Sequence, residues 1–342
     1  MEDLDALFAI LDRFSQTKLL VVGDMMLDRF IWGKVSRISP EAPVPVVQVT
    51  RESAHLGGAA NVVCNLESLG AKATPIGLIG TDGPAADFLG LLKASDIDDR
   101  GMVRDESFES IQKTRIIAQR QQVCRVDRER KTSLTPEQET KVQTRLFELL
   151  EEADAVIVSD YGKGVITRHL LQNLMQRAGK RIISVDPKDK NYDYYHDVTV
   201  ITPNQNEAQG MSGVDIEDEQ GLRKAASVIF EKLHCKRLLI TLGERGMALF
   251  RSPTDMVLIP TQAHEVFDVS GAGDTVIATY TLAKAAGATP RQAAILANAA
   301  AGVVVGKFGT ATLNRQELRE ALKRWQKLEA ERGETGFFAA KG

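Results

Sequence analysis

Short, continuous runs of branched apolar residues recur along the chain and are separated by segments with helical patterns. A strand with one wet face alternates apolar and polar residues, whereas a strand covered on both faces is apolar throughout. The continuous runs therefore predict a mostly parallel central sheet between two layers of helices, a three-layer α/β/α fold. The predicted strands cover residues 19–23, 75–79, 155–159, 182–186, 198–202 and 238–242.

Capping signals mark where several helices begin. Residues 135–138 read Thr-Pro-Glu-Gln and residues 289–292 read Thr-Pro-Arg-Gln, so each combines a capping box with a proline at the first helical position. Residues 314–317, Asn-Arg-Gln-Glu, repeat the spacing of the box. The apolar run over 293–305 is too short to cross a bilayer and predicts a buried helix instead.

Two segments, 30–50 and 110–128, do not fit this rhythm. The first contains prolines among its apolar residues, and the second partly alternates polar and apolar residues. Both patterns are typical of strands with one face in water. We therefore expect a small β-sheet lid, built from these two insertions, over the carboxyl ends of the main sheet. No linker divides the chain, which predicts a single domain over residues 1–342.

The charge balance and the cysteines limit the partners and the compartment. With 43 Lys and Arg against 46 Asp and Glu, the formal net charge is -3, so we expect no nucleic-acid partner and no membrane partner. The three cysteines form no metal-binding or disulfide pattern, which favours a reducing cytoplasm. Acidic residues follow Met1 and no apolar run is long enough to span a bilayer, so no secretory or membrane segment is expected.

The strongest functional signal is the motif Asp-Val-Ser-Gly-Ala-Gly-Asp at residues 268–274, directly before a helical pattern. Gly271, Ala272 and Gly273 let backbone N–H groups approach an anion, and a helix N-terminus adds partial positive charge at the same point. A carboxylate beside such an anion hole indicates that Asp274 is a general base, which takes a proton from a hydroxyl that attacks a phosphate. In the alternative interpretation, the glycines serve only the turn and Asp268 and Asp274 cap the helix.

Two further clusters are candidates for binding a polyol. Gly57 and Gly58 lead through two alanines to Asn61, whose amide can both donate to and accept from sugar hydroxyls; close helix–sheet packing is the alternative. Asp24 and Asp28 follow the first predicted strand, at the end of the sheet where ligands bind in such folds. Either carboxylate can accept hydrogen bonds from a polyol, and either can instead cap a turn.

Cations occur at the strand ends and in the second lid segment. Lys163, between two glycines after a strand, is predicted to be an exposed cation suited to an anionic group, or else a solvated turn lysine. Asp186 and Lys188 flank a proline, for which a plain turn is the alternative. A phosphorylated substrate would explain the lid residues, and a solvated strand face is the alternative; they are Lys113, Arg115, Gln119, Arg120, Gln121, Gln122, Arg125 and Arg128.

Two strand ends suggest a metal and a nucleotide. Asn204 and Glu207 are three residues apart, so they share one face of a helical turn and could hold a hydrated Mg²⁺, which keeps most of its waters. A capping box has the same spacing. Thr241 and Gly243 could border a nucleotide, or could belong to a turn that joins two strands.

The motifs at 57–61 and 268–274 resemble the two signatures of the ribokinase-like (PfkB) carbohydrate kinases, and the Asn204–Glu207 pair is similar to the Asn-x-x-Glu element of that family. The resemblance extends from Leu19 to Leu313. A narrower resemblance, to the D-glycero-β-D-manno-heptose-7-phosphate kinases, rests on residues 23–29, 36–45, 121–127 and 159–164. Val269 departs from the family, which usually has a threonine there, so the role of that hydroxyl is left open.

The resemblance implies a role for each motif. Asp274 would be the base, and Gly271, Ala272 and Gly273 the anion hole. The implied sugar-phosphate site consists of Asp28, Gly57, Gly58, Asn61, Arg120, Gln122, Arg125, Lys163, Asp186 and Lys188. The implied ATP site consists of Asn204, Glu207, Thr241, Gly243, Asp268 and Asn298, with Glu207 placing Mg²⁺.

The implied function is ATP-dependent phosphorylation of the anomeric hydroxyl of D-glycero-β-D-manno-heptose 7-phosphate, on the route to ADP-heptose and lipopolysaccharide. A stand-alone kinase is expected, because no His-x-Gly-His nucleotidyl motif is found. The resemblance also implies a homodimer through the lid, and it leaves dependence on a monovalent cation open. Two alternatives remain: another PfkB-type kinase acting on fructose 6-phosphate, a ribose or a nucleoside, and a non-catalytic sugar or nucleotide sensor.

Overall fold

The computed structural model describes residues 2–119, 121–129, 133–261, 266–307 and 309–332. Its main sheet has nine strands in the order β13-β12-β11-β10-β9-β8-β1-β4-β5. The strands from β11 to β5 pair in parallel, and β12 and β13 add an antiparallel edge. The bounds are β1 (Lys18–Gly23), β4 (Lys72–Ile79), β5 (Met102–Arg104), β8 (Ala155–Ser159), β9 (Ile182–Asp186), β10 (Val200–Ile201), β11 (Leu238–Thr241), β12 (Met247–Ser252) and β13 (Asp255–Ile259).

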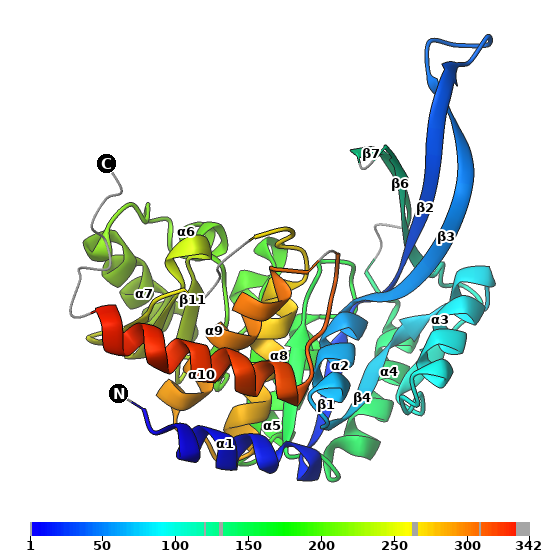
Figure 1. Cartoon of the computed structure of the whole chain (residues 1–342). Coiled ribbons are helices and arrows are strands. Elements are labelled where there is room, and N and C mark those ends of the chain that lie inside the picture. Colours follow the sequence, from blue (N-terminus) through cyan, green and yellow to red (C-terminus); the bar gives the residue numbers. More distant parts are fainter. Residues whose placement is uncertain (1, 120, 130–132, 262–265, 308, 333–342) are drawn as a thin grey trace.

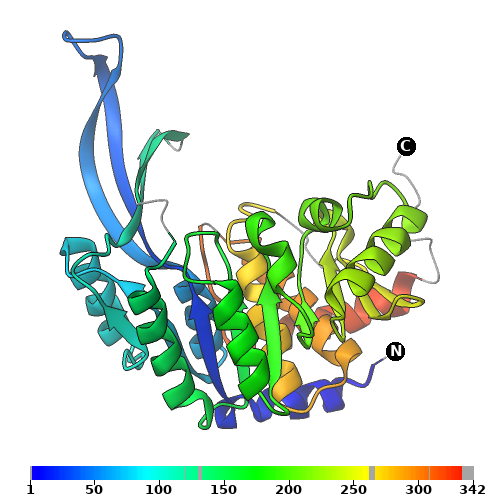
Figure 2. The same cartoon turned by 180° about the vertical axis from the view of Figure 1, so that it is seen from behind.

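Helices cover both faces of this sheet, which confirms the three-layer prediction (Figures 1 and 2). Successive side chains of β1 point to opposite faces: Leu19 and Val21 pack into one core cluster, and Leu20 and Val22 into the other. The first cluster includes α1 (Leu4–Asp12), α2 (Ala59–Ser68), α3 (Gly83–Ala94), α8 (Ala272–Ala285), α9 (Pro290–Val304) and α10 (Arg315–Arg332). The second includes α4 (Pro136–Leu150), α5 (Arg168–Arg177), α6 (Gln205–Ser212) and α7 (Glu219–Leu233).

The predicted helix starts are confirmed. Capping boxes with reciprocal hydrogen bonds open α4 and α9, and the Asn314–Glu317 pair makes the same two bonds before α10. Most side chains of α9 are buried, as its apolar run predicted. Within the described residues, every helix is too short or too polar to cross a bilayer.

One predicted strand is shorter than expected. Residues 198–202 contribute only the two-residue strand β10, which ends before Pro203, a residue with no N–H to pair; Thr199 and Thr202 still donate to carbonyls of β9. This short strand still places the following loop at the same edge of the sheet as the other strand ends.

A second sheet of four strands, which we call the arm, projects from the body (Figures 1 and 2). Its order is β3-β2-β6-β7, with β2 (Met25–Ile38), β3 (Pro45–Gly58), β6 (Ile111–Ala118) and β7 (Gln121–Arg128). The predicted lid segment 30–50 was too short, because the β2–β3 ladder continues into the body, from Met25 to Gly58. The strand β7 is exposed at every position rather than on one face, because it is an edge strand that no other described element covers.

Candidate active site

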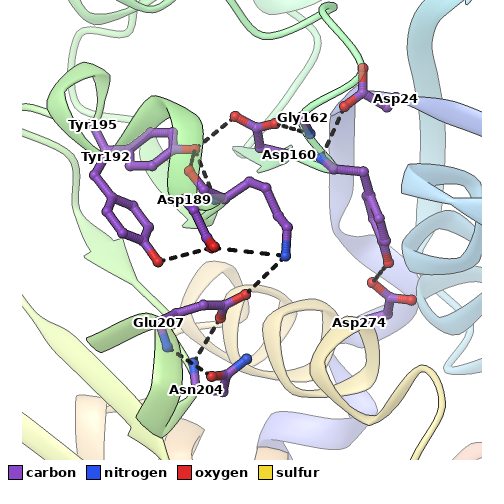
Figure 3. A network of polar contacts seen from close by, with 11 residues as sticks. Asp24, Asp160, Gly162, Asp189, Tyr192, Tyr195, Asn204, Glu207 and Asp274 are labelled. Atoms are coloured by element: carbon purple, nitrogen blue, oxygen red, sulfur yellow. Dashed lines mark hydrogen bonds and ion pairs between the residues drawn. The ribbon is translucent and has the colours of Figure 1, made fainter. Parts of the chain in front are cut away.

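The candidate site lies where parallel strands end and the arm begins. The segments after β1, β8, β9, β10 and β11 lie at this edge of the sheet, and Tyr161, which follows β8, contacts Asp274 in the first turn of α8. Figure 3 shows Asp24, Asp160, Glu207 and Asp274 in one network of polar contacts. The fold therefore brings together motifs that are far apart in the sequence.

Asp274 lies in the first turn of α8, as the glycine motif predicted. Gly271 is the N-cap residue with φ 78°, a conformation that favours glycine. Only 4% of the Asp274 surface is exposed. Nδ2 of Asn61 donates to Oδ2 of Asp274 at 2.6 Å, and the phenol of Tyr161 donates to Oδ1 at 2.7 Å. Burial raises the pKa of Asp274 to about 6 although both hydrogen bonds lower it, so the carboxyl is mostly ionised at neutral pH.

Asp28 points into the same region from β2. It is 5% exposed and pairs with the guanidinium of Arg115, on the neighbouring strand β6. That guanidinium also lies 5.3 Å from the centre of the Phe30 ring. The negative charge of Asp28 raises the pKa of Asp274, so the two carboxylates interact electrostatically.

Asp24 anchors a loop through its buried side chain. Its side chain is fully buried and accepts the backbone N–H groups of Tyr161, Lys163 and Val165 at 2.9, 3.0 and 3.1 Å. The sequence had left polyol binding and turn capping open for this residue, and these bonds favour the second. We call residues 160–164 the tyrosine loop.

Lys163 is not the exposed cation that its flanking glycines predicted. Its side chain is 19% exposed, and Nζ lies 2.8 Å from Oε1 of Glu129, just beyond β7. Glu129, at the end of the arm, therefore shields the lysine from solvent. Any anion that binds Lys163 must therefore compete with Glu129.

Lys188 and Glu207 form the side of the site opposite Asp274. Nζ of Lys188 lies 3.7 Å from Oε1 of Glu207. Burial raises the pKa of Asp186 well above its usual range, and the charges of Asp274 and Glu207 raise it further. The three carboxyls therefore line one electrostatically coupled region.

The Asn204–Glu207 pair forms the capping box that was its alternative interpretation. Oδ1 of Asn204 accepts the Glu207 N–H, and Oε2 of Glu207 accepts the Asn204 N–H, both at 3.0 Å. Among the described residues no group of three or more His, Cys, Asp or Glu could cage a metal. Glu207 is 16% exposed and its Oε1 is not used by the box, which fits a Mg²⁺ that keeps its waters better than a metal held by protein alone.

The remaining predicted nucleotide residues lie along the same edge. Thr241 forms a parallel bridge with Asn204, and Gly243 (φ 59°) belongs to the turn between β11 and β12, so that turn interpretation is confirmed. Asn298 is buried and donates to the Pro260 carbonyl at 2.6 Å. Asp268 closes its loop by accepting the N–H groups of Ser270 and Gly309 at 2.9 and 3.1 Å.

A cavity of about 510 Å³ lies between the arm and the loop before α8. Gln122, one of the predicted lid residues, reaches it, whereas Arg125 pairs with Asp127 on its own strand. Arg120 lies outside the described residues. The lining residues are Phe30, Trp32, Arg115, Ile117, Gln122, Asp268, Ser270, Gly309 and Thr310.

Two residues of the site were not assigned from the sequence. Tyr161 lay in a motif noted for its lysine, and nothing local showed that its phenol would reach Asp274. Arg115 was one of several lid cations, and only its pairing opposite Phe30 in the β2–β6 register places it beside Asp28. A buried carboxylate needs a nearby positive charge. A search for a cation on the strand next to Asp28 could therefore have identified Arg115.

Comparisons with known proteins show the family to which the chain is similar. A family model described as pfkB family carbohydrate kinase matches residues 16–317. The bifunctional protein HldE of Desulfatibacillum aliphaticivorans is 48% identical over 314 residues, which are 91% of this chain and 64% of that protein. The chain thus spans less than two thirds of the length of this curated relative.

Solved structures share the fold. Phosphofructokinase-2 from Escherichia coli, in complex with potassium, superposes with a TM-score of 0.74 at 18% identity over 91% of this chain and 99% of that one. Ribokinase from Arabidopsis thaliana, complexed with ribose and ATP, superposes with a TM-score of 0.70 at 18% identity over 90% of this chain and 99% of that one. At these identities the likeness concerns the fold.

Proposed function

The chain belongs to the pfkB family of carbohydrate kinases, which are ATP-dependent, and we propose that it transfers the γ-phosphoryl group of ATP to the anomeric hydroxyl of D-glycero-β-D-manno-heptose 7-phosphate. The observation that carries this proposal is Asp274, a buried carboxylate whose two oxygens are held by Asn61 and Tyr161 at the start of a helix. The similarity to HldE and the motifs around the tyrosine loop favour the heptose substrate over other sugars.

Asp274 acts as the general base in this proposal. It accepts the proton of the attacking hydroxyl, while Asn61 and Asp28 hold other hydroxyls of the sugar. The N–H groups from Gly271 to Gly273, at the positive end of α8, stabilise the negative charge that develops on the transferred phosphoryl group. In this arrangement the attacking sugar hydroxyl binds at Asp274, next to the transferred phosphoryl group at the N-terminus of α8.

The arm and the tyrosine loop recognise the phosphate that the sugar already carries. Lys163 and Arg115 supply positive charge and Gln122 supplies an amide, with Arg120 and Arg125 as further candidates. Asp186 and Lys188 would border the sugar-phosphate site from the end of β9. The arm would act as a lid that excludes water, because water would otherwise compete with the sugar hydroxyl for the γ-phosphoryl group of ATP.

ATP would lie along Asn204, Thr241, Gly243, Asp268 and Asn298. Glu207, through the oxygen that its capping box leaves free, would hold Mg²⁺ through water. When bound, the metal supplies positive charge to the β- and γ-phosphates. Lys188, 3.7 Å from Glu207, would contribute a second positive charge at the same point.

The edge strands of the arm, β3 and β7, have no further strand beside them among the described residues, so we propose a homodimer in which arms pair. The scattered cysteines favour the cytoplasm as its compartment. Dependence on a monovalent cation is open to a direct assay with potassium and sodium.

A substrate panel tests the reaction. ADP release should be fastest with heptose 7-phosphate, compared with fructose 6-phosphate, ribose and a nucleoside. Faster release with fructose 6-phosphate would assign the chain to another pfkB activity. No release with any sugar would favour a non-catalytic sensor.

Asp274→Asn tests the base. Turnover should fall by about 10²–10⁴, the usual contribution of a general base, while ATP and the sugar phosphate still bind. Asp218→Asn is the matched control, because Asp218 is the N-cap of α7 and asparagine caps equally well. Near-normal turnover of Asp274→Asn would refute the assignment.

A further inference from the structure

Two different elements hold the two oxygens of the Asp274 carboxylate. Asn61, on α2, bonds Oδ2 at 2.6 Å, and Tyr161, in the tyrosine loop, bonds Oδ1 at 2.7 Å. A carboxylate rotates easily about its last side-chain bond, so one donor would leave its orientation loose, and two donors on opposite oxygens fix it. Each carboxylate oxygen has two acceptor sites, so each retains one for a substrate hydroxyl.

Hydrogen bonds to Asp24 and Asp160 fix the backbone of the tyrosine loop around Tyr161. Asp24 accepts the N–H of Tyr161 itself and those of Lys163 and Val165 beyond it. On the other side, Oδ1 of Asp160 accepts the N–H of Gly162 at 2.7 Å, and Gly162 has φ 67°. Figure 3 shows Asp24 at one end of this network and Asp274 at the other. Because Asp24 is completely buried, the loop has a built support rather than an incidental contact.

We infer that Tyr161 is a positioning residue for the reaction: its phenol fixes the Asp274 carboxylate in the orientation that accepts the proton of the sugar hydroxyl. This inference rests on the proposed role of Asp274 as the base. Tyr161 acts through Asp274, so its removal should slow turnover more than it weakens binding of the sugar.

The phenol also has an electrostatic effect, because of what faces Asp274. Asn61 and Tyr161 contact it directly, and its charge interacts with those of Asp28 on β2 and Asp186 at the end of β9 and with Cys64 on α2. Burial and the neighbouring carboxylate of Asp28 raise the pKa of Asp274, whereas the hydrogen bonds from Asn61 and Tyr161 lower it. Loss of the phenol should therefore raise the pKa of Asp274 and leave less of the base ionised near neutrality.

The same loop joins the base to the phosphate site. Tyr161 and Lys163 are two residues apart, and Asp24 accepts both of their backbone N–H groups. The lysine side chain faces Glu129, and the tyrosine side chain faces Asp274. One buried carboxylate thus sets the positions of two groups with different proposed tasks.

Tyr161→Phe tests the inference, with Tyr194→Phe as the matched control. Phenylalanine keeps the ring and removes only the phenolic oxygen, so packing is retained. Tyr194 is also a half-buried tyrosine, and its ring lies 4.8 Å from the guanidinium of Arg168, a contact that phenylalanine preserves.

The first measurement needs no activity. The ¹³C signal of the Asp274 carboxyl, identified by its loss in Asp274→Asn, is titrated in ligand-free protein. The midpoint should rise by about one pH unit in Tyr161→Phe, as expected for loss of a hydrogen bond to a charged group, and should not move in Tyr194→Phe. An unmoved midpoint in Tyr161→Phe would overturn the inference.

The second measurement uses whichever sugar the wild-type enzyme phosphorylates. Tyr161→Phe should lower kcat, leave the KM of the sugar nearly unchanged and move the acid limb of the pH profile upward. A rise in KM alone, with the limb unmoved, would overturn the inference. If Asp274→Asn keeps its turnover, the proposed base fails instead, and the carboxyl titration still decides whether Tyr161 controls Asp274.

Discussion

Gly57 faces the carboxylate of Asp28 so closely that a Cβ on this glycine would lie 2.2 Å from Oδ2. The two residues are on the paired strands β3 and β2, at the base of the arm. The backbone of Gly57 does not have positive φ, so the glycine is needed for space and not for conformation. The small residue in this motif makes room for a carboxylate of the candidate sugar site.

Gly57→Ala should therefore raise the KM of the sugar, because Asp28 must move away from its partner Arg115. The KM of ATP should stay the same. Gly90→Ala, in α3, is the control, since a Cβ there meets no atom within 4 Å. Equal KM values of the sugar in the two variants would contradict this account of Gly57.

The pH profile should follow Asp274. The base works only when ionised, and burial raises its pKa to about 6. The kcat/KM should accordingly be level above pH 6 and fall about tenfold per pH unit below it. Stopped assays with heptose 7-phosphate from pH 5 to pH 8 would measure this. A profile that stays level to pH 5 would mean that Asp274 does not supply the base.

Lys163 and Glu129 allow a paired test of phosphate recognition. Lys163→Gln should raise the KM of the phosphorylated sugar far more than that of the dephosphorylated sugar. Glu129→Gln removes the carboxylate that competes for the lysine at 2.8 Å, so it should lower the KM of the phosphorylated sugar. Parallel losses in both variants, for both sugars, would show that the ion pair only supports the fold.

The Asp28–Arg115 pair should contribute to stability as well as to the site. Arg115→Ala leaves the nearly buried Asp28 without its cation, and the free energy of unfolding should fall by about 1–3 kcal/mol, less than for a fully buried pair because Arg115 is 25% exposed. Urea unfolding of Arg115→Ala, Asp28→Asn and the double variant measures the coupling. Additive effects would show that the pair is not coupled.

Patterns confined to a few residues predicted the layers well. Residues 155–159 and 182–186 became β8 and β9 with the predicted bounds, because strands buried on both faces are apolar at every position. The capping boxes were also found as predicted, since both partners lie within one helical turn. The arm was predicted as two insertions, but its length depended on a ladder between β2 and β3 that no local pattern records.

In the candidate site, too, some features follow from the local sequence and others from the tertiary structure. The glycine motif by itself determined that a helix begins near Asp274 with a carboxylate in its first turn, because backbone conformation and capping are local properties. Only the tertiary structure decided what that carboxylate touches: Asn61 is 213 positions away and Tyr161 is 113. It also decided that Asp24 anchors a loop and that Lys163 is covered by Glu129. Hydrogen bonds and ion pairs need groups within about 3–4 Å of each other, and only the packing of the sheet, the arm and α8 brings residues so distant in the sequence that close.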